Sequence, residues 1–159
     1  MSRHNDVFDI NYSHHLERMF GTITGRIDKI ITFIIILSGC AIFSSISGAI
    51  WFGALIASLS IFQVVFQFSR ASAISENLSR KYLALINDEP TLSDSELNLR
   101  KKNIQELDTN PWNLLKNSAH RRACIALGFP VNNPEPGILE KAFSWFAGDL
   151  PKITKQGSK

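Results

Sequence analysis

The sequence lacks the features on which catalysis and extracellular folding usually depend. It has two cysteines, Cys40 and Cys124, which we expect in separate helices, so they do not form a disulfide framework. This usage agrees with a reducing, cytoplasmic setting for the soluble part. The sequence has no glycine-rich phosphate loop, no nucleophile beside a base and no pair of carboxylates on a rigid frame. We therefore predict that the chain is not an enzyme and needs no cofactor.

A strong charge of one sign is also absent. The chain has 17 basic and 14 acidic side chains, which give a formal net charge of +3. An excess this small is compatible with a protein that faces anionic lipid headgroups. It is too small to indicate direct binding of nucleic acid.

One long stretch of the sequence lacks ionisable side chains altogether. No Asp, Glu, Lys, Arg or His occurs from Ile30 to Ser69, although 19% of the chain is charged. One helical crossing of the hydrocarbon core needs about 20 apolar residues, so this stretch is long enough for two. Its middle, residues 44–49, is small and polar enough for a tight turn. We predict two transmembrane helices, Ile30–Ile46 and Ile50–Phe68, joined as a hairpin.

A buried helical hairpin of a soluble protein is the alternative for this stretch. A soluble core helix has a wet face on which charges recur every few residues, and none recur here. The first span is also rich in Ile, Phe and Leu. Each such residue contributes roughly −0.3 to −0.6 kcal/mol to insertion near mid-membrane. We therefore favour insertion into a membrane.

The segment ahead of the spans divides into a tail and a helix. We expect residues 1–10 to be loosely held. From Asn11 onward, apolar residues recur at three- and four-residue steps, the pattern of a helix with one apolar stripe: Tyr12, Leu16, Met19, Ile23 and Ile27. This helix could lie in the membrane interface or pack on the downstream helices. We favour packing, because the polar face is mixed in charge.

The distribution of basic residues indicates the orientation in the membrane. They lie on both flanks of the uncharged stretch and are absent from its central turn: Arg3, Arg18, Arg26 and Lys29 before it, and Arg70, Arg80 and Lys81 after it. Basic residues stay on the cytoplasmic side of a membrane. We therefore predict a multi-pass protein of the bacterial inner membrane, with both termini in the cytoplasm.

The region after the second span is predicted to be helical throughout. The Ser93–Glu96 capping box marks a helix start, whereas Pro90 and Gly128 mark helix ends. The predicted segments are a continuation of the second span to about residue 88, a helix from Ser93 to Asp108, a helix from Asn110 to Gly128, and a short helix over Ile138–Ala147.

These segments predict an all-α membrane protein with three parts. Residues 1–29 form a cytoplasmic tail and an amphipathic helix. Residues 30–69 form the transmembrane hairpin, and residues 70–159 form a cytoplasmic helical region. We see no internal repeat and no β-strand.

A stripe of small and polar residues follows the second span: Gly53, Ala57, Ser60, Gln63 and Gln67. The spacing of Gly53 and Ala57 lets helix backbones approach closely. The two glutamines are costly in lipid, so they should face a partner helix or water. We favour packing on the first span, where Ser38, Ala41 and Ser45 make a matching stripe. Packing between subunits and the lining of an aqueous pore are the alternatives.

Three basic side chains form a candidate recognition patch in the cytoplasmic region: Lys116, Arg121 and Arg122. Such a patch could hold a phosphate, a lipid headgroup or an acidic partner, and a solvated helix face is the simpler alternative. Nearby, His120 and Cys124 have a spacing that could share a metal ion. Two ligands do not make a site, so we predict no metal centre.

An aromatic cluster closes the last predicted helix. It consists of Phe143, Trp145 and Phe146, followed by the lysines of the C-terminal segment. The cluster could dip into the membrane interface or be buried against the other helices. The sequence favours neither alternative.

Two resemblances bear on function. The order of a short N-terminal helix, a tight two-span hairpin and a helical tail resembles the SLATT-type two-transmembrane proteins of bacterial conflict systems, which implies a membrane-perturbing effector. Three segments, residues 11–18, 80–85 and 110–113, resemble small inner-membrane proteins carried by enterobacterial prophages. That group includes superinfection exclusion proteins, which stop a second phage from delivering its DNA. Neither resemblance assigns a functional residue.

These observations together predict a prophage-encoded inner-membrane protein that excludes superinfecting phage by binding. Its expected partners are the lipid bilayer and phage DNA-ejection proteins, and the stripe is compatible with a homo-oligomer. The alternatives are an oligomeric effector that leaks ions through the membrane and a passive membrane anchor or scaffold.

Overall fold

The computed structural model describes residues 3–43, 49–131 and 136–148, and every regular element among them is helical. The elements are α1 (Arg3–Phe43), α2 (Ala49–Phe66), α3 (Phe68–Asp88), the short 3-10 helix η1 (Glu89–Thr91), α4 (Asp94–Gln105), α5 (Asn113–Leu127) and α6 (Ile138–Phe146). The prediction of an all-α fold is confirmed for these residues. The predicted turn at residues 44–48 lies outside them.

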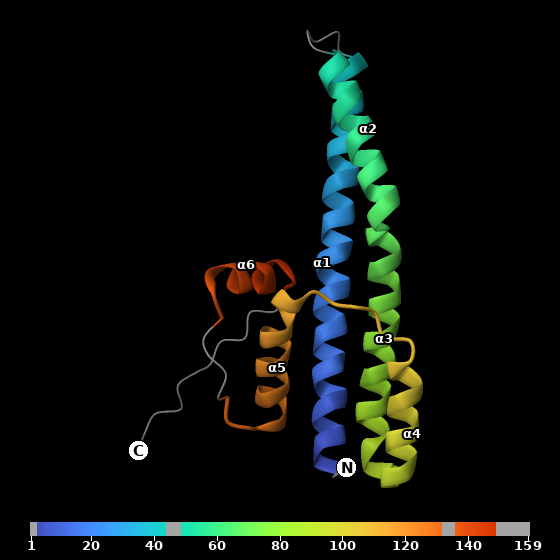
Figure 1. Cartoon of the computed structure of the whole chain (residues 1–159), viewed down its shortest axis with the longest axis vertical. Helices are drawn as coiled ribbons and strands as arrows, with labels where there is room; N and C mark the ends of the chain where they lie inside the picture. Colours follow the sequence, from blue (N-terminus) through green and yellow to red (C-terminus); the bar gives the residue numbers. More distant parts are fainter. Residues whose placement is uncertain (1–2, 44–48, 132–135, 149–159) are drawn as a thin grey trace.

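Helix α1 is the central helix, and the other helices are arranged around it (Figure 1). It runs from the N-terminal end of the molecule to the far tip, and α2 and α3 return beside it in succession. Helices α4 and α5 lie beside the N-terminal half of α1, and α6 crosses near its middle. The tip, formed by the last part of α1 together with α2, therefore has fewer neighbours than the rest.

The expectation of a loosely held tail is wrong for residues 3–10, whereas residues 1–2 lie outside the described part of the chain. Helix α1 begins at Arg3 and continues without a break through the amphipathic segment into the first predicted span. No proline interrupts residues 3–43, so the helix has no reason to stop. Asp6 and Ile10 as whole residues are 3% and 1% exposed, which shows that the first turns are held by their packing.

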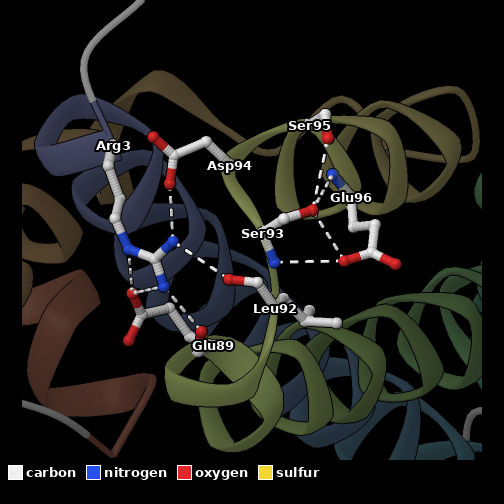
Figure 2. A network of polar contacts seen from close by, with 7 residues as sticks. All are labelled: Arg3, Glu89, Leu92, Ser93, Asp94, Ser95 and Glu96. Carbon is white, nitrogen blue, oxygen red and sulfur yellow. Dashed lines mark hydrogen bonds and ion pairs between the residues drawn. The ribbon is translucent and has the colours of Figure 1, made fainter.

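Arg3 ties the start of α1 to the turn between α3 and α4 (Figure 2). Its Nη2 lies 2.7 Å from Glu89 Oε1 and its Nη1 lies 2.6 Å from Asp94 Oδ1. The same guanidinium also donates to the carbonyls of Glu89 and Leu92 at 2.7 and 3.1 Å. One side chain thus satisfies carboxylates and carbonyls from the start of η1 to the beginning of α4.

The second predicted span and its continuation are two helices. Helix α2 ends at Phe66 and α3 begins at Phe68, because Gln67 adopts a left-handed backbone conformation with φ 46° and ψ 45°. Such a conformation is unfavourable for a residue with a Cβ. The Gln67 N–H still donates to the Gln63 carbonyl at 2.9 Å, and the Gln67 carbonyl accepts from Ala71 N–H at 3.0 Å. The chain is therefore redirected at Gln67 without losing these hydrogen bonds.

The helix signals after the second predicted span are mostly confirmed. Helix α4 has the predicted capping box between Ser93 and Glu96, although it ends at Gln105, before the predicted limit at residue 108. Helix α5 begins at Asn113, three residues later than predicted, and its end at left-handed Gly128 is as predicted. There Phe129 N–H donates to the Cys124 carbonyl at 2.8 Å, which satisfies an end-of-helix acceptor.

Two apolar clusters fix these helices around α1. The larger cluster joins α1 to α5 and to the end of α6: Leu16, Met19, Phe20, Ile23, Leu115, Ala119 and Ala147. The smaller cluster joins α1 to α3 and α4: Ile10, Tyr82, Leu85 and Leu97. The amphipathic stripe of the N-terminal half of α1 is therefore packed against downstream helices, as predicted. We call this packed part, residues 3–29 with α3–α6, the base.

Candidate membrane surface and its polar base

The tip of the molecule carries a belt of exposed apolar side chains, which we call the apolar belt. Its large exposed members come from α1 and α2: Ile30, Phe33, Ile36, Leu37, Ile50, Trp51, Leu55, Ile61, Phe62, Val64, Val65 and Phe66. A contiguous apolar surface of this extent is typical of a site that contacts a membrane or another protein. It begins one residue after Lys29, where the charged residues of α1 stop.

One helical run among the described residues, Ile50–Thr91, is long and apolar enough to cross a membrane. None of its most apolar 18-residue window is buried within the structure. The core helix of a soluble protein would have most of such a window covered. This helix therefore presents its apolar side chains outward.

The predicted small-residue stripe does not pack on α1 through Gly53 and Ala57. A Cβ added to Gly53 would meet no atom within 4 Å, and Ala57 is exposed. Of the matching residues in the first span, Ser38 is buried, whereas Ser45 lies outside the described residues. The favoured interpretation is therefore wrong for Gly53 and Ala57, because another face of α2 meets α1.

Gln63 is the member of the stripe that contacts α1. Its Nε2 donates to Asp28 Oδ1 at 2.8 Å and to Thr32 Oγ1 at 3.1 Å. Gln67 is exposed and its Oε1 accepts from Arg70 Nη1 at 3.2 Å. Ser60 is half-buried. Gln63 thus links α2 to α1 at the lower end of the apolar belt, whereas Gln67 contacts Arg70 at the start of α3.

The close helix approach lies elsewhere, between α1 and α3. A Cβ on Gly21 would lie 3.3 Å from Glu76 N and from Ser72 O, and a Cβ on Gly25 would lie 2.7 Å from Ser72 Oγ. Ser72 Oγ also donates to the Gly21 carbonyl at 2.7 Å. Gly21-x-x-x-Gly25 is itself a small-xxx-small pattern. That spacing is the signal from which this seam could have been predicted.

A buried ion pair joins two helices of the base. Lys101 Nζ lies 2.5 Å from Asp6 Oδ1, with both side chains 5% exposed, and 3.1 Å from Asp9 Oδ2. The hydrogen bond from Lys101 holds the pKa of Asp6 below its usual value. Lys101 thus joins α4 to the first two turns of α1, and this adds an electrostatic connection to the smaller apolar cluster.

A second polar group joins α1 and α3 to the loop after α4. Thr109 Oγ1 lies 2.8 Å from both carboxylate oxygens of buried Glu17, and Tyr82 Oη donates to Asp108 Oδ1 at 2.6 Å. Burial raises the pKa of both Glu17 and Asp108. The loop is thereby fixed to α1 by a hydrogen-bonded carboxyl group inside the base.

The predicted basic patch is not one continuous surface. Lys116 is exposed, Arg122 is half-buried, and the Arg121 side chain is buried at 5% exposed. Arg121 is therefore not available to an exposed recognition patch, because α5 turns that side toward its neighbours. His120 Nδ1 lies 3.6 Å from Cys124 Sγ, and no group of three metal-ligating side chains occurs among the described residues.

Helix α6 divides the predicted aromatic cluster. Phe143 and Phe146 pack against the larger apolar cluster, whereas Trp145 is 70% exposed, together with Ile138 at 88% and Leu139 at 67%. Another face of α6 is held on α5, where Ser144 hydrogen-bonds Ser118.

Helix α6 is also attached to α1 close to the apolar belt. Arg26 Nη1 donates to the Phe146 carbonyl at 2.5 Å, and the guanidinium carbon lies 5.9 Å from the Phe146 ring centroid. In Figure 1, α6 runs across the direction of α1 and lies at the end of α5 that is nearer to the tip. Because Ser144 of α6 faces α5, the exposed residues of α6 lie on its other sides.

Fold and surface together define an all-helical protein with a packed polar base and an apolar tip. No protein-family model matches the chain, and neither a curated protein nor a solved structure matches it. The function must therefore be argued from the molecule itself.

Proposed function

We propose that the tip is a two-helix hairpin that crosses the bacterial inner membrane, with both ends of the chain in the cytoplasm. The observation that carries this proposal is the apolar belt, which lies directly above a base that holds two buried apolar clusters. In water the belt would leave large Ile, Phe and Leu surfaces uncovered. In a bilayer the acyl chains cover them, and the helical backbone satisfies its own hydrogen bonds.

The place of α6 supports the same arrangement. Arg26, which holds α6, lies about one helical turn before Ile30, where the belt begins. If the belt is in the hydrocarbon, α6 lies at the level of the headgroups. An interfacial helix places its apolar residues on the lipid side, and the exposed residues Ile138, Leu139 and Trp145 lie on sides of α6 other than the one that faces α5. Trp is favoured at that depth.

The contacts of Gln63 favour an anchor over a pore. A pore needs polar side chains directed into a shared aqueous path, but the Gln63 amide donates to Asp28 and Thr32 of the same chain. Gln63 therefore does not support the alternative of an oligomeric effector that leaks ions through the membrane. A binding protein held at the membrane by a rigid hairpin accounts for the same contacts.

We propose superinfection exclusion as the biological role of this anchored protein. The support is the resemblance of three segments to prophage inner-membrane proteins, together with a base that presents cytoplasmic surface beside the membrane. On this proposal the protein binds phage DNA-ejection proteins as they enter the inner membrane, and no chemistry is required.

The test is expression of the full chain alone, followed by challenge with phage. Exclusion predicts survival, normal membrane potential and normal phage adsorption, with phage DNA kept outside the cell. Depolarisation and growth arrest would support the effector instead. Normal infection at a normal membrane level of the protein would leave the anchor or scaffold. Reporter fusions at both ends test the topology, and a periplasmic C-terminus would contradict the hairpin.

A further inference from the structure

A groove of about 590 Å³ runs along the seam between α1 and α3, below the apolar belt. Four basic side chains line it: Arg18, Arg26, Lys29 and Arg80. Glu76 is the one carboxylate among the lining residues. The groove is therefore strongly positive, although the whole chain carries a net charge of only +3.

Two of the four cations are already engaged. Arg80 Nη2 lies 2.6 Å from Glu76 Oε1, so the single carboxylate is paired within α3. Arg26 donates to the Phe146 carbonyl. Arg18 and Lys29 are exposed, and neither forms an ion pair or a side-chain hydrogen bond with any described residue. These two side chains are available to an anion.

The floor of the groove is fixed by the close approach of α1 and α3. Ser72 Oγ donates to the Gly21 carbonyl, and a Cβ added to Gly25 would lie only 2.7 Å from the same Ser72 hydroxyl. Farther down, His14 Nδ1 lies 2.8 Å from the Ser79 carbonyl. Because these contacts set the spacing of the helices, the cations are carried on a rigid frame.

The long axis of the groove points toward the membrane. Lys29 is the last charged residue before the apolar belt, and Arg18 lies eleven residues earlier, which is about 16 Å along a helix. In a membrane-spanning hairpin, Lys29 and Arg26 lie at headgroup depth and Arg18 lies in the cytoplasm. Basic pockets at this depth are suited to anionic headgroups.

We propose that this groove binds a phosphate-bearing anion at Lys29, with Arg18 adding electrostatic attraction from farther along the groove, and that an anionic phospholipid headgroup is the source of the anion in the cell. The phosphate site rests on the groove alone. The lipid source also rests on the proposed membrane hairpin. A soluble phosphorylated molecule presents the same chemistry, so the experiment separates the two sources.

The experiment uses the full chain purified in a neutral detergent. Native mass spectrometry measures retained phosphatidylglycerol and, in a separate arm, phosphatidylcholine. A third arm uses glycerol 1-phosphate, which has the phosphate and no acyl chains. The groove variant is Arg18→Gln with Lys29→Gln. Its matched control is Lys102→Gln with Lys116→Gln, which removes the same charge from exposed positions outside the groove.

The expected result is preferential retention of phosphatidylglycerol by the wild type and the control. In the groove variant this retention should fall roughly fivefold or more, since each basic residue near an anionic headgroup contributes about that factor. Equal loss in both double variants, or no preference for phosphatidylglycerol over phosphatidylcholine together with no binding of glycerol 1-phosphate, would overturn the site. Variant-sensitive binding of glycerol 1-phosphate alone would keep the phosphate site and overturn the lipid source.

Membrane anchoring is read out separately. All variants should remain in carbonate-washed membranes, because the groove lies outside the apolar belt. A chain that washes off the membrane but binds glycerol 1-phosphate would contradict the proposed function and leave the phosphate site intact.

Discussion

The two halves of α1 contain similar apolar side chains in opposite surroundings. In the lower half, Met19 and Ile23 are each 1% exposed, whereas in the upper half Phe33 and Ile36 are 65% and 60% exposed. Among the described residues, α3, α4 and α5 lie beside the lower half, and α2 runs beside the upper half. One continuous helix thus passes from the interior of the base to an exposed apolar surface.

The polar groups of the base and of the tip differ in the same way. In the base, buried Asp6 and Glu17 each have partners, as buried polar groups in a folded domain should. The exposed surface of the apolar belt carries no charge at all from Ile30 to Phe66. The base is therefore organised like a soluble domain, and the tip like a lipid-facing one. Parallel changes in the two regions test this contrast.

The largest effect is expected at the buried ion pair of the base. Lys101→Met leaves the Asp6 carboxylate buried without its cation, which should lower the free energy of unfolding by about 3–5 kcal/mol. The matched control is Arg100→Met, whose pair with Asp88 is about half exposed on both sides. Loss of such a pair costs about 0–1 kcal/mol. Denaturant unfolding of both variants, followed by tryptophan fluorescence, checks the contrast, and similar losses would contradict it.

A charge placed in the apolar belt should make insertion into the membrane less favourable. Leu37→Arg puts a cation near the middle of the first span, which costs about 2.5–3.5 kcal/mol of insertion free energy. Leu99→Arg is the control, because the two leucines are 58% and 60% exposed and Leu99 lies on α4. The fraction of protein in carbonate-washed membranes should fall for Leu37→Arg alone. Retention of both variants would place the belt outside the bilayer.

Substitutions at two glycines test which small residues lie at a close contact between helices. Gly21→Leu should clash with the backbone of α3 and cost about 1–3 kcal/mol of stability, because a Cβ there is 3.3 Å from two backbone atoms. Gly53→Leu should leave the folded monomer unchanged, since a Cβ there meets nothing. Thermal unfolding in detergent measures both. Loss of a crosslinked oligomer in Gly53→Leu, with monomer retained, would show that the stripe packs between subunits.

A smaller effect concerns pH. Burial lowers the pKa of His14, and the positive charge of Arg18 acts in the same direction. Stability from neutral His14 is therefore present above the unfolded pKa of about 6.5 and is lost as the pH falls through the folded pKa. The wild type should lose about 1 kcal/mol per unit of that shift relative to His14→Gln.

The comparison of wild type with His14→Gln isolates His14. Glu17 and Asp108 have raised pKa values, so they stabilise the fold at low pH and oppose the effect of His14. They are the same in both proteins and cancel in the difference. Denaturant unfolding at pH 7.5 and pH 5.5 gives the measurement. A difference that does not change with pH would show that His14 does not titrate on unfolding in this range.

Much of the fold could be predicted from local sequence signals. The capping box at Ser93, the end at Gly128 and the apolar stripe from Tyr12 to Ile27 each depend on neighbours in the chain, and each is found. Residues 3–10 could not be predicted in this way. Arg3 and Asp6 are held by Glu89 and Lys101, which are distant in sequence and are brought near only by the fold.

The site was harder to predict for the same reason. Gly53-x-x-x-Ala57 and Gly21-x-x-x-Gly25 have equivalent spacing, and only the arrangement of α3 decides which of them meets another helix. Arg121 and Arg122 are adjacent in sequence, but one is buried and the other is half-buried. The groove required Arg18 and Arg80 to be brought together from two helices.

The most direct test of the lipid-covered tip is the reactivity of Cys40. It lies among the residues of the apolar belt and is exposed in the isolated chain. A Cys124→Ser variant leaves it as the single thiol, and Ser95→Cys in a variant lacking both native cysteines gives a reference thiol on the exposed surface of α4. In inverted membrane vesicles, a membrane-impermeant maleimide should label the reference thiol quickly and Cys40 only after denaturation. Equal labelling of both thiols in native vesicles would contradict a lipid-covered tip.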